Sequence, residues 1–453
     1  MSSQEPLDRS QPPKPGRPTT YQFPDFLSTS LDNGLRIAVL PSRRFPVVHA
    51  QLLLPAGGQE APLDAPGLAA LHGILLTEGS TERTGIELAL AIEALGGYLA
   101  SGAGMNMAYV EVGSLLSQHF DAGMDLLAEA ALRPRFPEDQ VERLCDEQAV
   151  DLLRRRSRPR ALADDTFSEV IYDGTVYARP LEGTRESLSR IGRGDLLDFY
   201  RQHVGPEGST LMVVGDVDPD AVVKRAEALF GGWPPAKGAL TTPINPRQLD
   251  GREVHIVDRP GSAQTQLQLG HAGPPRSHPD FERCLLLNVL FGGKFTSRLN
   301  LNLREKNGFT YGAASSFVRR RGPGPFLART AVATDVAGAA TREILAEMER
   351  VCEAEVDTTE LQETVDYILG VFPYTAQTVE DLSGRLESLI VFDLPKDHFQ
   401  RYLRKLPEVT PAELHTIART HLHPDRLAIV AVGPEEDLRP QLEGLGPITV
   451  HRA

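Results

Sequence analysis

The chain has 453 residues and a formal net charge of −14 at pH 7, and this length predicts two or more domains instead of a single core. The acidic balance argues against nucleic acid as a partner, because phosphate binding needs clustered lysine and arginine side chains. No apolar run reaches the ~18 residues that a membrane span requires.

Residues 1–24 are polar and rich in proline, without the apolar stretch of a secretion signal. We interpret them as a disordered N-terminal segment and expect a cytoplasmic protein, or a periplasmic one if a signal peptide has been removed. The three cysteines, Cys145, Cys284 and Cys352, are far apart in the sequence. They therefore predict neither a disulfide framework nor a Cys-x-x-Cys metal site.

The first half combines short runs of apolar residues, typical of strands, with longer helical patterns. Strands are expected over residues 35–40, 47–54 and 108–115, and helices over 84–96, 116–132 and 137–157. Thr84 and Glu87 form a capping box at the start of the first of these helices. Because strands and helices do not alternate one by one, the pattern favours an α+β sandwich, with helices on a mostly antiparallel sheet.

An internal repeat organises the whole chain. Arg201–Pro206, followed by an apolar run that ends at Gly215, recurs without gaps as Arg419–Pro424 followed by a run that ends at Gly433. Each copy has the pattern of a helix end, a proline turn and a buried strand stopped by glycine. The repeat predicts two homologous α/β-sandwich domains.

We place the N-terminal domain at residues 25–235 and the C-terminal domain at 250–453. Residues 236–249 contain prolines and show no periodicity, so they are expected to form a linker.

The segment Pro66–Ser80, PGLAALHGILLTEGS, resembles the active-site helix of the pitrilysin/insulinase-type (inverzincin) zinc metallopeptidases, in their processing-peptidase-like bacterial branch. Active members read Gly-Leu-Ala-His-x-x-Glu-His. Two histidines four residues apart hold one Zn²⁺ from one helix face, and the glutamate takes a proton from zinc-bound water. The similarity extends from Leu31 to Val450.

At the motif positions this chain departs from the active pattern. Ala70 and Ile74 occupy the histidine positions, and Gly73 occupies the glutamate position. By the family's usual separation, the distal ligand would fall at Val150 or Asp151, and Asp151 alone cannot hold zinc. The resemblance therefore implies a zinc-free chain without catalytic residues for zinc chemistry. The apolar substitutions predict a filled pocket on a helix that is buried on all sides.

Other histidines do not replace the missing motif. His72 lies two residues after Ala70, so it points to the opposite side of the helix, and we expect it to be a core residue. We predict no metal site and assign no function to the remaining isolated polar motifs, which are His271, His278, the His421-x-His423 pair and Gly292-Gly293-Lys294.

A second family motif is intact. Gly292–Leu299 and Leu303–Gly312 resemble the segment Gly-Gly-x-x-Ser-Arg-Leu, then Leu-Arg-Glu-Lys-x-Gly-x-x-Tyr. The resemblance implies that Arg304 helps to hold the substrate backbone and that the Tyr311 hydroxyl donates to the oxyanion. A helix over about 296–306 and a strand from about residue 310 would bring the two side chains close together.

Two hypotheses follow from the contrast between the lost zinc motif and the intact motif that carries Arg304 and Tyr311. In the first, the chain is a zinc-free subunit that supplies Arg304 and Tyr311 to a zinc-bearing paralogous peptidase acting on peptides. In the second, it is a non-catalytic scaffold or binding protein, such as the homodimeric core subunit of a larger assembly. A self-sufficient metallopeptidase with an unusual zinc site is a third alternative. Without the flanking motif, Arg304 and Tyr311 would be a solvated helix-end cation and an ordinary strand aromatic.

Overall fold

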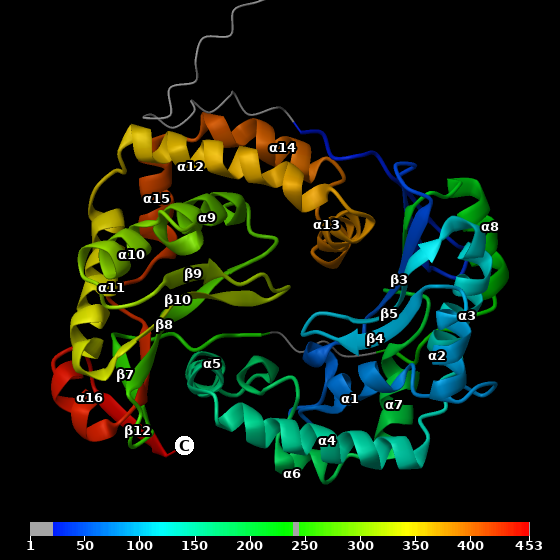
Figure 1. The fold of residues 1–453 in the computed structure, drawn as a ribbon, viewed down its shortest axis with the longest axis horizontal. Helices are drawn as coiled ribbons and strands as arrows, with labels where there is room; N and C mark the ends of the chain where they lie inside the picture. Colours follow the sequence, from blue (N-terminus) through cyan, green and yellow to red (C-terminus); the bar gives the residue numbers. More distant parts are fainter. Residues whose placement is uncertain (1–20, 239–243, 453) are drawn as a thin grey trace, which may run out of the picture.

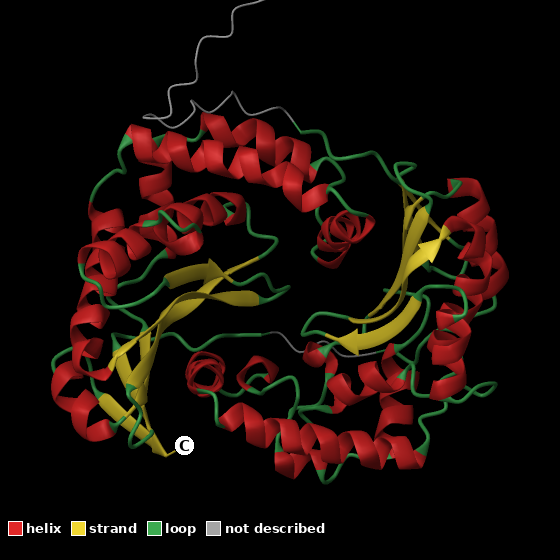
Figure 2. Cartoon of the chain, viewed as in Figure 1, coloured by secondary structure: helices red, strands yellow, loops and turns green. Residues whose placement is uncertain are grey.

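The computed structural model describes residues 21–238 and 244–452 as two six-stranded sheets covered by helices (Figures 1 and 2). The first half comprises β1 (Leu27–Ser30), β2 (Arg36–Pro41), β3 (Val47–Leu54), α1 (Leu68–Leu75), α2 (Gly85–Glu93), β4 (Tyr98–Ala103), β5 (Ala108–Leu116), α3 (Phe120–Leu132), α4 (Glu138–Arg156), α5 (Pro159–Tyr172), α6 (Arg185–Leu188), α7 (Arg193–His203), β6 (Thr210–Gly215) and α8 (Pro219–Phe230).

The second half follows the same plan. It comprises β7 (Glu253–Asp258), β8 (Gln264–Pro275), α9 (Phe281–Asn288), α10 (Arg298–Asn300), β9 (Ala313–Phe317), β10 (Pro323–Ala333), α11 (Ala337–Glu353), α12 (Thr358–Val371), α13 (Val379–Val391), α14 (His398–Lys405), α15 (Pro411–His421), β11 (Ala428–Gly433), α16 (Glu435–Leu442) and β12 (Ile448–Arg452). In the described part of the chain, no helix is long and apolar enough to cross a membrane.

The strand order is β1-β2-β6-β3-β5-β4 in one sheet and β12-β7-β11-β8-β10-β9 in the other. Most neighbouring strands are antiparallel, and the parallel pairs are β2 with β6, β7 with β11, and β7 with β12. The predicted α+β class is therefore confirmed. The repeat is visible in space as well, because α7 and β6 take the same places in the first half as α15 and β11 in the second.

Local patterns located the elements of the first half well. The strands expected over 35–40, 47–54 and 108–115 are β2, β3 and β5, and the three expected helices are α2, α3 and α4. The Thr84 hydroxyl accepts a hydrogen bond from the Glu87 amide, and the Glu87 carboxylate accepts one from the Thr84 amide. This capping box starts α2 where the sequence predicted it.

One helix from each half packs against the sheet of the other half. Helix α13 packs on β3 and β6 of the first sheet, while α5 packs on β7, β8 and β11 of the second, as Figure 1 shows. Both helices bury branched and aromatic side chains against the strands, for example Leu386 of α13 and Phe167 of α5. The two cores therefore depend on each other, although the sheets themselves come from separate halves of the sequence.

An arginine-rich turn between β9 and β10 joins the two halves. The Arg320 guanidinium lies 4.3 Å from the centre of the Tyr177 ring. The Arg321 amide donates to Asn106 Oδ1 at 3.0 Å, and its Nε donates to the Val391 carbonyl at 2.9 Å. One turn of the second half thus contacts both the first half and α13.

The predicted N-terminal segment needs one correction. Residues 1–20 lie outside the described part of the chain, but the Phe23 side chain is only 2% exposed. It packs against Phe399, with ring centroids 5.1 Å apart, and its carbonyl accepts a hydrogen bond from Gln400. Burial of an aromatic ring orders residues 21–24, which the prolines nearby had suggested were disordered. Of the predicted linker, residues 239–243 also lie outside the described part.

Candidate functional site

Helix α1 carries the degenerate zinc positions. It begins after Gly67, whose φ of 97° places the backbone in a left-handed conformation that glycine adopts without strain. Ala70 and Ile74 lie one turn apart on the same face, as the two histidines of an active enzyme would. Neither side chain has a donor atom for a metal, so the residues present do not fit zinc.

Gly73 allows α1 to lie directly against β4. A Cβ atom at this position would come within 2.5 Å of the Gly102 carbonyl carbon and 2.6 Å of the Ala103 nitrogen. Both are backbone atoms of a paired strand, so they cannot move aside as a flexible side chain could. At the position where active enzymes have the catalytic glutamate, close packing against β4 thus leaves no room for a glutamate side chain.

The predicted filling of the zinc pocket is wrong at Ile74, although Ala70 is buried. Ile74 is 37% exposed. It lines an open pocket of about 590 Å³, together with Asp151 and the arginines Arg154, Arg155, Arg158 and Arg160. The helix is covered by β4, α4 and α7, but at Ile74 it faces an open pocket that the start of α5 also lines. Apolar composition alone did not reveal which face was uncovered.

The distal ligand positions do not compensate for this loss. Val150 is 47% exposed, and the side chain of Asp151 is 71% exposed and pairs with Arg154 at 3.2 Å. Arg155, in the same pocket, forms ion pairs with Asp165 and Glu182. The carboxylates of Asp151 and Glu182 in this pocket are thus already paired with arginines, and these ion pairs compete with binding of a metal cation.

His72 lies on the opposite side of α1, in the core, as expected. Its side chain is fully buried among the rings of Phe136, Phe199 and Tyr200. Neither ring nitrogen has a hydrogen-bond partner among the residues that the structure describes. Burial, and to a lesser degree the neighbouring His203, lowers the pKa of His72 to about 3.

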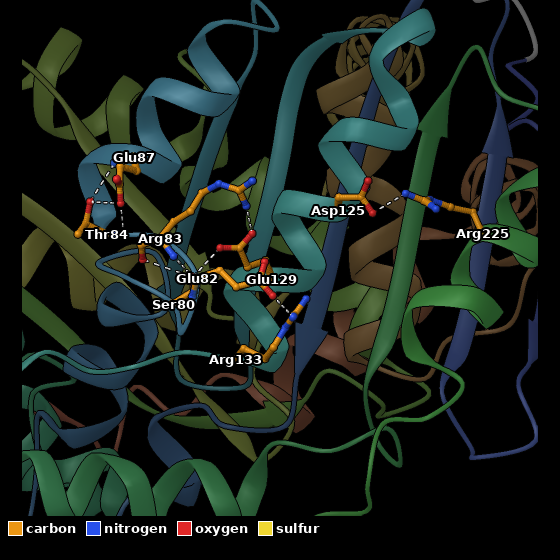
Figure 3. Close-up of polar contacts among 9 residues, drawn as sticks. All are labelled: Ser80, Glu82, Arg83, Thr84, Glu87, Asp125, Glu129, Arg133 and Arg225. Carbon is orange, nitrogen blue, oxygen red and sulfur yellow. Dashed lines mark hydrogen bonds and ion pairs between the residues drawn. The ribbon is translucent and has the colours of Figure 1, made fainter.

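A buried carboxylate fixes the segment that follows α1 (Figure 3). Glu129 of α3 has a side chain only 3% exposed, and it accepts a hydrogen bond from the Ser80 hydroxyl at 2.5 Å and pairs with Arg83. The same Ser80 oxygen accepts from the amides of Glu82 and Arg83. The chain therefore leaves α1 along a path anchored to α3.

Replacing Glu129 by alanine should lower the free energy of unfolding by about 2–3 kcal/mol, because Ser80 loses its buried acceptor and Arg83 loses its partner. Urea denaturation followed by circular dichroism measures this change. Glu82→Ala is the matched control, since its pair with Arg133 is half exposed and should contribute less than about 1 kcal/mol. Equal losses in the two variants would contradict the assigned role of Glu129.

The second motif lies between α9 and β9. Ser297 precedes α10, the chain widens to a π-helical turn over Leu301–Lys306, and Gly308 has a φ of 64°. The expected helix and its left-handed stop are thus present, although most of the helix has π-type pairing. Strand β9 begins only at Ala313, so Tyr311 lies in the turn before the strand and not in it.

Arg304 and Tyr311 are not joined to each other. The Arg304 guanidinium lies 4.3 Å from the centre of the Phe295 ring and 3.5 Å from the Glu305 carboxylate. Tyr311 is 95% exposed. In the described part of the chain, no hydrogen bond or ring contact links Arg304 to Tyr311, so each is separately available to another molecule.

Asn300 holds the Tyr311 turn in place, a role that the sequence did not reveal. Its side chain donates to the Ala313 carbonyl and accepts from the Ala313 amide, each at 2.9 Å. Asn300 is 8% exposed, so these two bonds are shielded from water. Nearby, Arg298 makes a two-bond pair with Glu360 of α12, at 2.7 and 2.6 Å. The exposed turn that carries Tyr311 is therefore held by buried hydrogen bonds at its end.

Comparison with known proteins agrees with the motifs. The family profile for insulinase (peptidase family M16) matches residues 37–185, and the profile for the peptidase M16 inactive domain matches residues 190–367. The chain belongs to the M16 peptidase family. This M16 chain has a zinc-protease-like fold that lacks the catalytic motif.

The relatives differ in how much of the chain they share. A Mycobacterium bovis protein described as an uncharacterized zinc protease is 26% identical over 91% of this chain and 94% of its own length. One from Rickettsia felis with the same description is 24% identical over 64% of this chain and 69% of its own length. The description as a zinc protease applies to those proteins.

Solved structures share the fold of the M16 chain. A peptidase M16 inactive domain protein from Pseudomonas fluorescens has a TM-score of 0.85 at 24% identity, covering 90% of this chain and 98% of its own. A protease from Helicobacter pylori has a TM-score of 0.85 at 19% identity, covering 91% and 100%.

Proposed function

We propose that this M16 chain is the zinc-free, non-catalytic subunit of a two-chain peptidase that cleaves peptides. Its partner would be a zinc-bearing paralogous subunit. The observation that carries the proposal is the contrast between the two motifs. The zinc helix has neither metal ligands nor space for a base at Gly73, while Tyr311 is exposed on a turn anchored by Asn300.

The two retained side chains have the chemistry that this role requires. A zinc ion in the partner would activate the attacking water. The Tyr311 hydroxyl can donate a hydrogen bond to the oxyanion that forms on the peptide carbonyl. The Arg304 guanidinium, already oriented by stacking on Phe295, can donate to carbonyl oxygens of an extended peptide. Neither step requires a metal in this chain.

Tyr311→Phe should lower kcat of the reconstituted pair by about 100-fold or more, because a lost oxyanion donor costs roughly 2.7–4 kcal/mol in other enzymes. KM should change little. The measurement is cleavage of a fluorogenic peptide by this chain mixed with the zinc-bearing subunit. Tyr374→Phe is the matched control, since Tyr374 is also exposed, at 70%, but lies between α12 and α13. Equal kcat values for Tyr311→Phe and the unmodified pair would exclude the oxyanion role.

The scaffold alternative rests on the apolar side chains around the same motif. Phe295, Leu301 and Tyr311 are 67%, 50% and 95% exposed, and a partner chain could cover these side chains without any catalysis. Light scattering of the mixture, read beside the peptide assay, separates the two proposals. A stable complex that cleaves no peptide favours the scaffold, whereas cleavage that depends on Tyr311 favours the peptidase subunit.

A further inference from the structure

Two histidines and an aspartate from distant parts of the sequence meet at one end of α9. His278 lies in the loop after β8, Asp280 immediately precedes α9, and His421 is the last residue of α15. Each side chain offers one ligand atom, and the three atoms all lie within 4.8 Å of one another. His421 Nε2 is 3.1 Å from Asp280 Oδ2, and His278 Nδ1 is 4.0 Å from the same oxygen.

We propose that these three residues bind a divalent transition cation of the zinc type, at a structural site distinct from the degenerate zinc helix, so that the chain lacks only the catalytic zinc. Two imidazoles and one carboxylate form a ligand set that zinc uses in proteins, with water as the fourth ligand. With metal–ligand bonds of about 2.0–2.1 Å, tetrahedral ligands lie roughly 3.3 Å apart. His421 and Asp280 already have about this spacing, whereas His278 Nδ1 has to approach Asp280 Oδ2 by roughly 0.7 Å and also come nearer to His421.

The internal repeat explains the position of His421 but not its neighbours. The equivalent residue in the first half, His203, packs on Phe199 with ring centroids 4.5 Å apart, and within residues 21–238 and 244–452 its Nδ1 has no hydrogen-bond partner. No ion pair joins His203 to a carboxylate in the described part of the chain. A purely structural role for this histidine therefore requires neither Asp280 nor His278, and the second half has both.

The geometry leaves the site accessible. The side chain of His278 is 38% exposed and lines a pocket of about 450 Å³. Arg283 pairs with Asp280 Oδ1 at 3.1 Å, which leaves Oδ2 directed toward the histidines. The Asp280 amide donates to His278 Nδ1 at 3.2 Å, a long bond that a cation at this nitrogen would replace. A bound cation would tie the loop before α9 to the end of α15.

The test uses the full chain, freed of any purification tag and of metal by EDTA. Zn²⁺ is titrated by calorimetry, and Co²⁺ by its visible absorption, which reports nitrogen and oxygen ligands directly. We expect one strongly bound equivalent. Asp280→Asn and His278→Gln should each weaken binding by more than about tenfold, because even groups behind metal ligands contribute that much. Thermal unfolding in EDTA checks that both variants are folded. If Asp280→Asn is unfolded, the zinc affinity of His278→Gln alone decides the test.

Two controls identify the site. His119→Ala removes a histidine of the first half whose ring is hydrogen-bonded to Gln118, and Asp151→Asn removes the carboxylate beside the degenerate zinc helix. Both should bind Zn²⁺ as the unmodified chain does. Binding that survives in His278→Gln, binding lost in Asp151→Asn, or no binding by the unmodified chain would each overturn the proposal.

Discussion

Gly73→Glu is expected to destabilise the folded chain by about 3 kcal/mol, and not to restore a catalytic base. The Cβ alone would lie 2.5 Å from the Gly102 carbonyl carbon, well inside van der Waals contact. A glutamate adds a carboxylate that would either be buried against β4 or force α1 away from the sheet. Both outcomes cost free energy, and displacing α1 would also disturb the packing of His72 behind it.

Ile74→Glu is the matched control, because it places the same side chain one residue further along, where α1 faces the open pocket. Its unfolding free energy should change by less than about 1 kcal/mol. Urea denaturation followed by circular dichroism compares the two variants, and Gly73→Ala shows how much of the loss is due to the Cβ alone. A Gly73→Glu chain as stable as Ile74→Glu would mean that α1 can move away from β4 at little cost.

The parts of the fold that depend on local patterns could be predicted from the sequence. Alternating or continuous apolar runs located β2, β3 and β5, and the Thr84–Glu87 capping box located α2. The repeat was equally predictable, since Arg201 and Arg419 begin segments with the same order of helix, proline turn and strand. Each of these patterns involves residues that are close in the sequence, so it can be recognised without knowledge of the three-dimensional neighbours.

Features that depend on distant contacts could not be predicted. Nothing near Gly73 in the sequence indicates the backbone of β4, and nothing near Asp280 indicates His421. The exchange of α5 and α13 between the sheets likewise involves segments far apart in the chain. For Tyr311, the apolar and β-branched residues around it suggested a strand, but the bonds from Asn300 delay the strand until Ala313. Position in a motif was predictable, and the exposure of the side chain was not.

Acid should destabilise the M16 chain partly through His72. Its pKa is about 3 in the folded chain, against an ordinary value of 6.5 in the unfolded chain. Between these values the unfolded chain binds a proton that the folded chain does not, so stability falls as the pH is lowered below about 6.5. The loss approaches about 1.4 kcal/mol per pH unit for this histidine.

His72→Leu should therefore be more stable than the unmodified chain, by about 1 kcal/mol at pH 7 and about 3 kcal/mol at pH 5. The gain at pH 7 arises because both ring nitrogens are buried without a hydrogen-bond partner in the described part of the chain, and leucine removes that cost. Urea denaturation at the two pH values measures both effects. An unchanged or lower stability at pH 5 would mean that the ring is hydrated or can turn outward.

His271 provides the matched contrast, because burial also lowers its pKa to about 3 but its ring is hydrogen-bonded. Its Nδ1 donates to the Ala272 carbonyl at 2.9 Å, and its Nε2 accepts from the His423 amide at 3.2 Å. His271→Leu leaves these two backbone groups without partners, so it should lower stability at pH 7 by about 1–3 kcal/mol. At pH 5 the same substitution should cost less, because it also removes a histidine that the unfolded chain would protonate. Opposite signs for the two leucine variants at pH 7 would show that hydrogen bonding, and not burial alone, decides what a core histidine contributes.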